Sequence, residues 1–202
     1  MDRNEILNSG LLELYVTGSL EGSELALVNE ALSKDPLLAH EVDQIEQAFF
    51  LYAHAHAIAP SPAVKPMLMA KIDYVERLKQ GEIPSAIPTL NSDTKIKDFE
   101  AWLNREDMQL RDDFDGMQAT IIAHEPDKLT AIVWLKYGAP TETHTNEYEK
   151  FLIIEGSCDI TIGTTVHPLK PGNYLSMPLH VSHDVKVTSS IPCKIILQRV
   201  NI

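Results

Sequence analysis

The sequence predicts an α+β protein of two domains, an all-helical N-terminal unit followed by an antiparallel β-barrel of the jelly-roll kind. Two observations predict this class. Apolar residues recur every three or four positions as far as about residue 80, which is the spacing of amphipathic helices. From about residue 98, short segments rich in β-branched residues alternate with turn signals, as in barrels and sandwiches. We therefore expect a helical domain at 1–80, a linker at 81–97 and a barrel domain at 98–202.

Four helices are expected in the first domain. Asp35-Pro36 gives one of them a strong start signal, an N-cap followed by proline at the first helical position. Pro66 opens the last helix, which ends at Gly81. The apolar positions that mark the four faces are Leu7, Leu11 and Leu14; Leu25, Val28 and Leu32; Leu38, Val42, Ile45, Phe49 and Tyr52; and Leu68, Ile72 and Val75. Four helices in this length make a small bundle or an open helical unit.

The remainder of the chain changes character. Residues 81–97 hold two prolines and little periodicity, which is typical of a linker. Strands are then expected at 119–123, 129–135, 151–154, 158–162, 174–177, 184–187 and 193–197. Turn signals such as Gly156, Gly163 and Pro171-Gly172 separate several of them.

Composition limits the classes of function. The net charge of −12 argues against non-specific binding to nucleic acid or anionic membranes, because both need a basic surface. No apolar run approaches the length of a membrane span, and the N-terminus does not resemble a signal peptide. Cys158 and Cys193, the two cysteines, lie in expected strands and suggest neither a disulfide scaffold nor a metal motif. We therefore expect a cytoplasmic protein.

The stretch from Gly138 to His183 contains the candidate metal ligands. Glu142, His144 and Glu149 lie in and after an expected loop, and the following strand ends at Gly156. A second stretch begins at Gly172, continues through Pro178 and delivers His183. Small antiparallel barrels build metal sites from residues far apart in sequence in this way.

These stretches resemble the two motifs of the cupin family, roughly G-x5-H-x-H-x3-4-E-x6-G and G-x5-P-x-G-x2-H. The loop after Gly138 is shorter than in the family. His144 therefore fits either the first or the second histidine of the motif. In the first alignment Asn146 replaces the second histidine, and in the second alignment Glu142 replaces the first. We prefer the second, because the distance to Glu149 is set by a strand, whereas loop lengths vary more easily.

The resemblance then implies Glu142, His144, Glu149 and His183 as the ligand set. Two imidazoles and a carboxylate suit zinc, nickel, iron or manganese. In the alternative interpretation, the barrel has lost its metal and these residues only line a polar cavity. No nucleophile or separate acid–base pair accompanies them, so we assign no catalytic residue.

The first helices carry a second resemblance. Ser9-Gly-Leu-Leu-Glu-Leu-Tyr15-Val-Thr-Gly18, an acidic second helix and Lys34-Asp35-Pro36 are similar to the helical domain of ChrR-type anti-sigma factors. In that family three helices and a fourth, tethered one enclose an extracytoplasmic-function sigma factor, and a cupin domain follows. The resemblance implies a sigma factor as partner, and Leu11, Leu14 and Tyr15 are candidate contacts or, alternatively, core residues. A homodimer through the barrel is a further candidate.

The helical part departs from that family in one respect. Zinc-binding members carry His-x3-Cys-x2-Cys there, and this chain has no cysteine before Cys158. We therefore expect no zinc in the N-terminal domain. His54 and His56 cannot share an ion, because residues two apart on a helix point in nearly opposite directions. Residues 1–50 contain ten carboxylates and only two basic side chains, Arg3 and Lys34. This acidic surface has two interpretations: it binds a basic partner, or it only keeps the protein soluble.

Two classes of function fit the sequence. The first is a regulator whose helices sequester a sigma factor while the cupin domain binds metal as a sensor or stabilises the fold. The second is a small metal-dependent enzyme, an oxygenase, isomerase or hydrolase, with the helices mediating oligomerisation. We favour the regulator, because the domain order matches that of the ChrR type and no separate catalytic machinery is visible.

Overall fold

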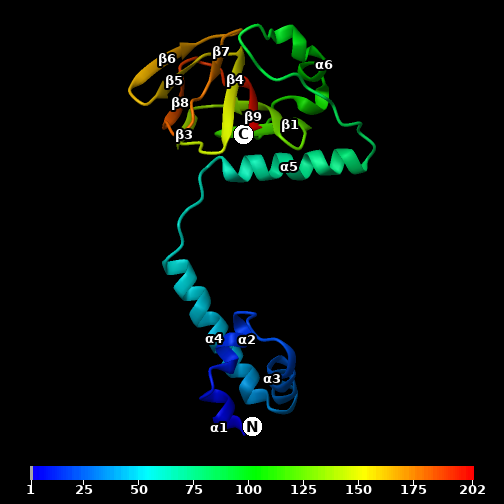
Figure 1. Ribbon diagram of the computed structural model, residues 1–202, viewed down its shortest axis with the longest axis vertical. Coiled ribbons are helices and arrows are strands. Elements are labelled where there is room, and N and C mark those ends of the chain that lie inside the picture. Colours follow the sequence, from blue (N-terminus) through cyan, green and yellow to red (C-terminus); the bar gives the residue numbers. More distant parts are fainter. Residues whose placement is uncertain (1) are drawn as a thin grey trace. The chain divides into compact units, whose positions relative to one another are not determined.

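The computed structural model describes residues 2–202 and divides the chain into two compact units, Met1–Ala59 and Pro60–Ile202 (Figure 1). Helices make up the first unit, and antiparallel sheets dominate the second. The predicted α+β class is therefore confirmed. In the described residues no helix is long and apolar enough to cross a membrane.

The first unit contains α1 (Arg3–Leu7), α2 (Leu11–Val16), α3 (Gly22–Lys34) and α4 (Pro36–Ala55). Asp35 caps α4 as predicted, because its side chain accepts a hydrogen bond from the amide of Leu37. The first expected helix is split in two at Gly10, whose φ of 77° lies in the left-handed region. The core of this unit consists of Ile6, Leu12, Leu20, Val28, Leu38 and Val42.

The candidate contact residues of the first unit divide between its core and its surface. Leu11 and Tyr15 pack against the core, whereas the side chain of Leu14 is exposed. The second half of α4 extends beyond this core. Its side chains Phe49, Phe50, Leu51 and Tyr52, here named the apolar end of α4, are 42–67% exposed. His54 and His56 are exposed as well.

Two antiparallel sheets form the barrel of the second unit. The larger sheet has the strand order β1-β2-β9-β4-β7 and the smaller one β3-β8-β5-β6. The strands are β1 (Met117–His124), β2 (Lys128–Leu135), β3 (Gly138–Glu142), β4 (Glu147–Glu155), β5 (Cys158–Ile162), β6 (Thr165–Leu169), β7 (Tyr174–Ser176), β8 (His183–Val187) and β9 (Cys193–Asn201). Side chains from both sheets share one core, in which Cys158 and Cys193 are buried. The sequence did not predict β3 and β6, which are short and carry a proline each.

The helix α5 (Val64–Lys79) belongs to the barrel unit, whereas the sequence analysis placed it in the helical domain 1–80 (Figure 1). Ala70 and Tyr74 are part of the barrel core, and the Arg77 guanidinium donates a hydrogen bond to the carbonyl of Ile121 in β1. The helix has a second apolar face, Leu68, Ile72 and Val75, which is 41–55% exposed. That face is the stripe on which the helix was predicted, and the opposite face is the one that packs.

An ion-pair network, here named the α5 clamp, holds the C-terminal end of this helix. Glu82 accepts hydrogen bonds from the guanidinium groups of Arg77 and Arg105 at 2.7–3.2 Å. Arg105 also pairs with Asp107, at 2.6 Å. The clamp therefore fixes the end of α5 to the segment that follows it.

The expected linker at 81–97 is part of the barrel unit and packs against it. Ile87 and Leu90 are buried, and the side chain of Gln198 in β9 accepts from the amide of Leu90 at 2.8 Å. Together with η1 (Ile96–Phe99), α6 (Glu100–Leu103) and η2 (Glu106–Met108), this segment covers apolar residues of β1, β2, β4 and β9. These strands are apolar on both faces, so the sheet needs cover on both sides. Residues 56–63 have no regular secondary structure. The boundary between the two units lies in this segment and not at the expected linker 81–97.

Candidate metal centre

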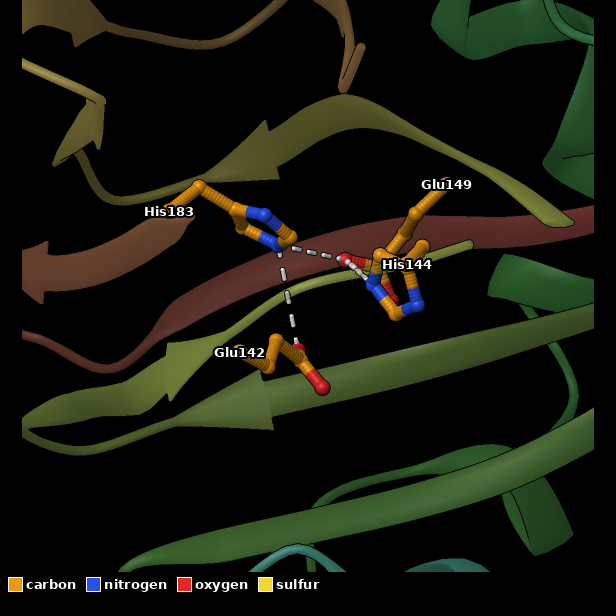
Figure 2. A group of neighbouring side chains, drawn as sticks. All are labelled: Glu142, His144, Glu149 and His183. Carbon is orange, nitrogen blue, oxygen red and sulfur yellow. Dashed lines mark hydrogen bonds and ion pairs between the residues drawn. The ribbon is translucent and has the colours of Figure 1, made fainter. Parts of the chain in front are cut away.

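The four candidate ligands come together in one cluster (Figure 2). Glu142 ends β3, His144 lies in the following loop, Glu149 is in β4 and His183 begins β8. One donor atom from each residue lies within 4.8 Å of all the others. Residues from four positions of the chain thus form one cluster, as the motif spacing predicted.

Strand pairing sets this geometry. Residue Glu142 lies opposite His183 in the pairing of β3 with β8. The two strands approach closely at Gly138, where a Cβ atom would lie 2.0 Å from the carbonyl oxygen of Val185. Only glycine can occupy this position, which has a φ of 147°. The first glycine of the motif therefore brings β3 to the strand that carries His183.

The loop and turn around His144 fit the preferred alignment. Asn146, the alternative ligand, is exposed to solvent, whereas Glu142 lies in the cluster. The amide of His180 donates to the carbonyl of His144 at 2.8 Å and so fixes the loop. His180 has a φ of 61° and occupies the place of the second glycine in the second cupin motif. Its backbone is left-handed although it is not glycine, which costs about 1 kcal/mol.

The donor atoms converge on Glu149. Its Oε2 lies 3.1 Å from Nε2 of His183 and 3.4 Å from Nε2 of His144. Oε1 of Glu142 lies 3.9 Å from Nε2 of His183. The contact at 3.4 Å is an ion-pair distance without hydrogen-bond alignment, because Nε2 of His144 has no hydrogen-bond partner.

These residues fit a metal ion. Ligands about 2.1 Å from a tetrahedral ion are roughly 3.4 Å apart. Three contacts within the cluster, at 3.1, 3.4 and 3.9 Å, are close to this spacing, and all four donors lie within 4.8 Å of one another. Nε2 of His144 is buried without a hydrogen bond among the described residues, a state that costs about 1–3 kcal/mol unless something else occupies the nitrogen. Imidazole nitrogen and carboxylate oxygen are ligands of zinc and of other first-row divalent ions. The cluster could therefore hold a divalent metal.

Charged neighbours stabilise the ionised form of Glu149. Burial by itself raises the pKa of its carboxyl, but the imidazoles of His144 and His183 beside it and the charge of Arg199 hold the pKa well below its usual range. Burial and the charge of Glu149 raise the pKa of Glu142. The carboxylate of Glu149 also raises the pKa of His144. The cluster is therefore a site of strong negative potential.

Sequence reasoning missed two members of the site, Arg199 and Glu147. Arg199 Nε donates to Oε1 of Glu149 at 3.0 Å, and its terminal nitrogens lie 3.5 Å from Glu142 and Glu147. Glu147 Oε1 lies 3.3 Å from Nδ1 of His144. Position 199 has the same parity in β9 as Ile195 and Leu197, which belong to the barrel core, and that parity was the available signal.

The features of the second unit define a class, an antiparallel barrel with a histidine and carboxylate cluster. Comparison with known families makes it specific: residues 134–198 match the cupin domain. The second unit therefore contains a cupin domain, as the motif resemblance predicted, and the match includes the four clustered residues.

Solved structures with similar folds are remote. KdgF from Halomonas sp. is 21% identical, with 48% of this chain and 89% of that chain covered and a TM-score of 0.41. TT1209 from Thermus thermophilus is 18% identical, covering 54% and 98%, with a TM-score of 0.43. The Cnp3 cupin domain of Schizosaccharomyces pombe is 15% identical, covering 44% and 67%, with a TM-score of 0.41. The search of curated proteins gives no match.

Proposed function

We propose that this protein is a regulator that binds an extracytoplasmic-function sigma factor through its N-terminal helices and α5, with a cupin domain that holds a divalent metal ion as a sensor or stabilising element. The observation that carries the partner-binding part is the exposure of large apolar side chains on two helices. They are the apolar end of α4 (Phe49, Phe50, Leu51 and Tyr52) and the outer face of α5 (Leu68, Ile72 and Val75).

Contiguous apolar side chains on a surface mark interaction sites. Burying them contributes about 25 cal/mol for each Å² removed from water, so a partner that covers both helices gains affinity from each. The resemblance to ChrR-type anti-sigma factors supplies the identity of the partner, since three helices and a fourth, tethered one enclose the sigma factor in that family. The separate attachment of α5 to the barrel unit agrees with a tethered fourth helix.

Charge supports the same partner. The apolar end of α4 follows Glu41, Asp43 and Glu46, and residues 1–50 carry ten carboxylates against two basic residues. A surface of this sign complements the basic faces with which a sigma factor contacts DNA. The absence of cysteine before Cys158 means that binding by the first unit would not require zinc.

Charge balance supports a divalent ion in the cupin domain. Glu142, Glu147 and Glu149 contribute three negative charges, and Arg199 contributes one positive charge. Neutral imidazoles, the form that binds metal, leave a net charge of about −2, which one divalent cation neutralises. The residues that would hold it are His144, Glu149, His183 and Glu142, and the ion would be zinc, nickel, iron or manganese.

The alternative is a small metal-dependent enzyme, and the clustered donors favour it. Beside the cluster, a cavity of about 30 Å³ is lined mainly by apolar residues, among them Met67 of α5, together with Glu142 and Arg199. This volume holds about one water molecule. A second cavity of about 200 Å³, whose lining includes Glu147 and Arg199, is large enough for a small molecule. The regulator is favoured by the exposed apolar faces of α4 and α5 and by the resemblance of the first helices, and not by lack of space at the cluster.

Co-purification of the full chain with the sigma factor encoded beside its gene tests the proposal. Phe50→Glu on α4 and Ile72→Glu on α5 are each expected to weaken capture at least tenfold. Gln47→Glu and Gln80→Glu are matched controls, because they add the same charge at exposed positions of the same helices or their ends without removing an apolar side chain. Capture that is equal in all variants, or absent in the wild type, together with turnover of a small molecule by the metal-loaded protein, would favour the enzyme.

A further inference from the structure

Arg199 occupies a central position among the carboxylates of the candidate metal centre. It lies directly opposite Glu149 in the pairing of β9 with β4. Its guanidinium contacts Glu149, Glu142 and Glu147, which lie in β4 and β3. Neither of the cupin motifs includes this position, and no other cation contacts these three carboxylates in residues 2–202 apart from the clustered histidines.

The first consequence concerns the orientation of Glu149. This side chain has 0% exposure, so water does not hold it in place. Oε1 receives the hydrogen bond from Nε of Arg199, at 3.0 Å. Oε2 is therefore the oxygen directed toward the two imidazoles. Because the guanidinium of Arg199 donates to Oε1 alone, it restrains the carboxylate and leaves Oε2 free to bind an ion.

The second consequence concerns His144. Its Nδ1 lies 3.3 Å from Oε1 of Glu147, and Arg199 lies 3.5 Å from the same oxygen. A carboxylate at Nδ1 favours the tautomer that carries the proton there, and so leaves Nε2 free for a metal. Arg199 restrains the carboxylate that sets this tautomer.

We propose that Arg199 is the positioning residue of the metal centre, holding Glu149 directly and His144 through Glu147 in the arrangement that binds a divalent ion. This inference rests on the metal binding proposed above. It makes a prediction whose sign is opposite to that of simple electrostatics. A positive charge near the site repels a cation, so its removal alone would strengthen metal binding. Loss of positioning weakens it instead, and outer-shell substitutions of this kind lower metal affinity about 10–100-fold.

The experiment measures Zn²⁺ affinity of the full chain by competition with a chelating dye. Arg199→Gln is expected to bind Zn²⁺ about 10–100-fold more weakly than the wild type. Arg199→Lys is expected to lie between the two, because lysine keeps the charge but lacks the planar fork. The matched control is Arg105→Gln, which removes an arginine from the α5 clamp and should leave Zn²⁺ affinity unchanged.

The absorption spectrum of bound Co²⁺ gives a second readout, which a purely structural role would not move. We expect its ligand-field bands to shift in Arg199→Gln and to keep the wild-type form in Arg105→Gln. If Arg199→Gln does not fold, Arg199→Lys and Glu147→Ala carry the test, and both should bind Zn²⁺ more weakly than the wild type.

The outcomes separate the two proposals. A wild type that binds no Zn²⁺ would overturn the metal function and this inference with it. A wild type that binds Zn²⁺, with equal or tighter binding and an unchanged Co²⁺ spectrum in Arg199→Gln, would overturn the role of Arg199 alone.

Discussion

The candidate metal centre and the α5 clamp are both networks of charged side chains in the second unit, and they differ in how completely their polar atoms are partnered. In the clamp, both oxygens of Glu82 accept hydrogen bonds from two guanidinium groups. In the metal centre, Nε2 of His144 and Nδ1 of His183 are buried without a hydrogen bond. In the described residues 2–202, no side-chain atom of the α5 clamp is buried without one. A saturated network can only hold structure together, whereas an unsaturated one is ready for a ligand.

The largest effect is expected where the backbone supports the metal centre. Gly138→Ala would place a methyl group 2.0 Å from the carbonyl oxygen of Val185, a contact that only movement of β3 away from β8 relieves. We expect a loss of about 3 kcal/mol in the free energy of unfolding, together with loss of metal binding. Chemical denaturation and elemental analysis measure the two effects. Gly172→Ala is the control, since nothing lies within 4 Å of its added Cβ and only the backbone cost of its φ of 86° remains.

Removal of one imidazole should strongly weaken metal binding. In His183→Ala we expect Zn²⁺ affinity to fall roughly 100-fold or more, because too few donors remain to hold the ion tightly. Elemental analysis of protein purified without chelator checks this. A metal content equal to that of the wild type would remove His183 from the ligand set.

The clamp should behave in the opposite way. Glu82→Gln removes the charge that two arginines share, and we expect unfolding to become easier by about 2 kcal/mol while Zn²⁺ affinity stays unchanged. Thermal unfolding and dye competition on the same preparation check both halves. A coupled loss of metal affinity would show that the two networks are not independent.

The contribution of the α5 clamp to stability should also depend on pH. Burial raises the pKa of Glu82, but hydrogen bonds from Arg105 and Arg77 outweigh it and hold the pKa below the usual value of 4.5. A carboxyl whose pKa is lower in the folded than in the unfolded state stabilises the fold above the unfolded value, and this contribution disappears as pH falls through the folded value. We therefore expect the wild type to lose stability below about pH 4.5 more steeply than Glu82→Gln. Urea titrations at about pH 3–6 compare the two slopes.

The smallest effect concerns the turn before His183. His180→Gly should relieve the left-handed backbone at a φ of 61°, partly offset by the greater freedom of glycine when unfolded. We expect a gain of about 0.5 kcal/mol in stability and no change in metal affinity. Equilibrium denaturation measures it, and a loss of stability would indicate that the imidazole of His180 contributes contacts of its own.

The four clustered donors could be predicted because the spacing of each motif is local in the sequence. Strand pairing then brings the two motifs together. Arg199 could not be predicted in the same way. It is fifty residues from Glu149 and belongs to no motif, and only its shared strand parity with the core residues Ile195 and Leu197 pointed to it.

The domain boundary was misplaced for a related reason. Helix α5 has two apolar faces, and periodicity finds a helix without saying which face packs. The stripe Leu68, Ile72 and Val75 suggested a place in the helical bundle, whereas Ala70 and Tyr74 attach the helix to the barrel. Ile87 and Leu90 are single apolar residues among prolines, too sparse to reveal that the expected linker packs on a sheet.

The eight residues at 56–63 have a consequence for affinity. A fully extended chain of this length spans at most about 28 Å, so the apolar end of α4 and the outer face of α5 remain tethered at short range. Once one of them binds a partner, the other meets it at an effective concentration that for short flexible linkers is of millimolar order. Two weak contacts would then act with the strength of a much tighter one, and cleavage of the tether alone would lower the avidity while leaving each contact unchanged.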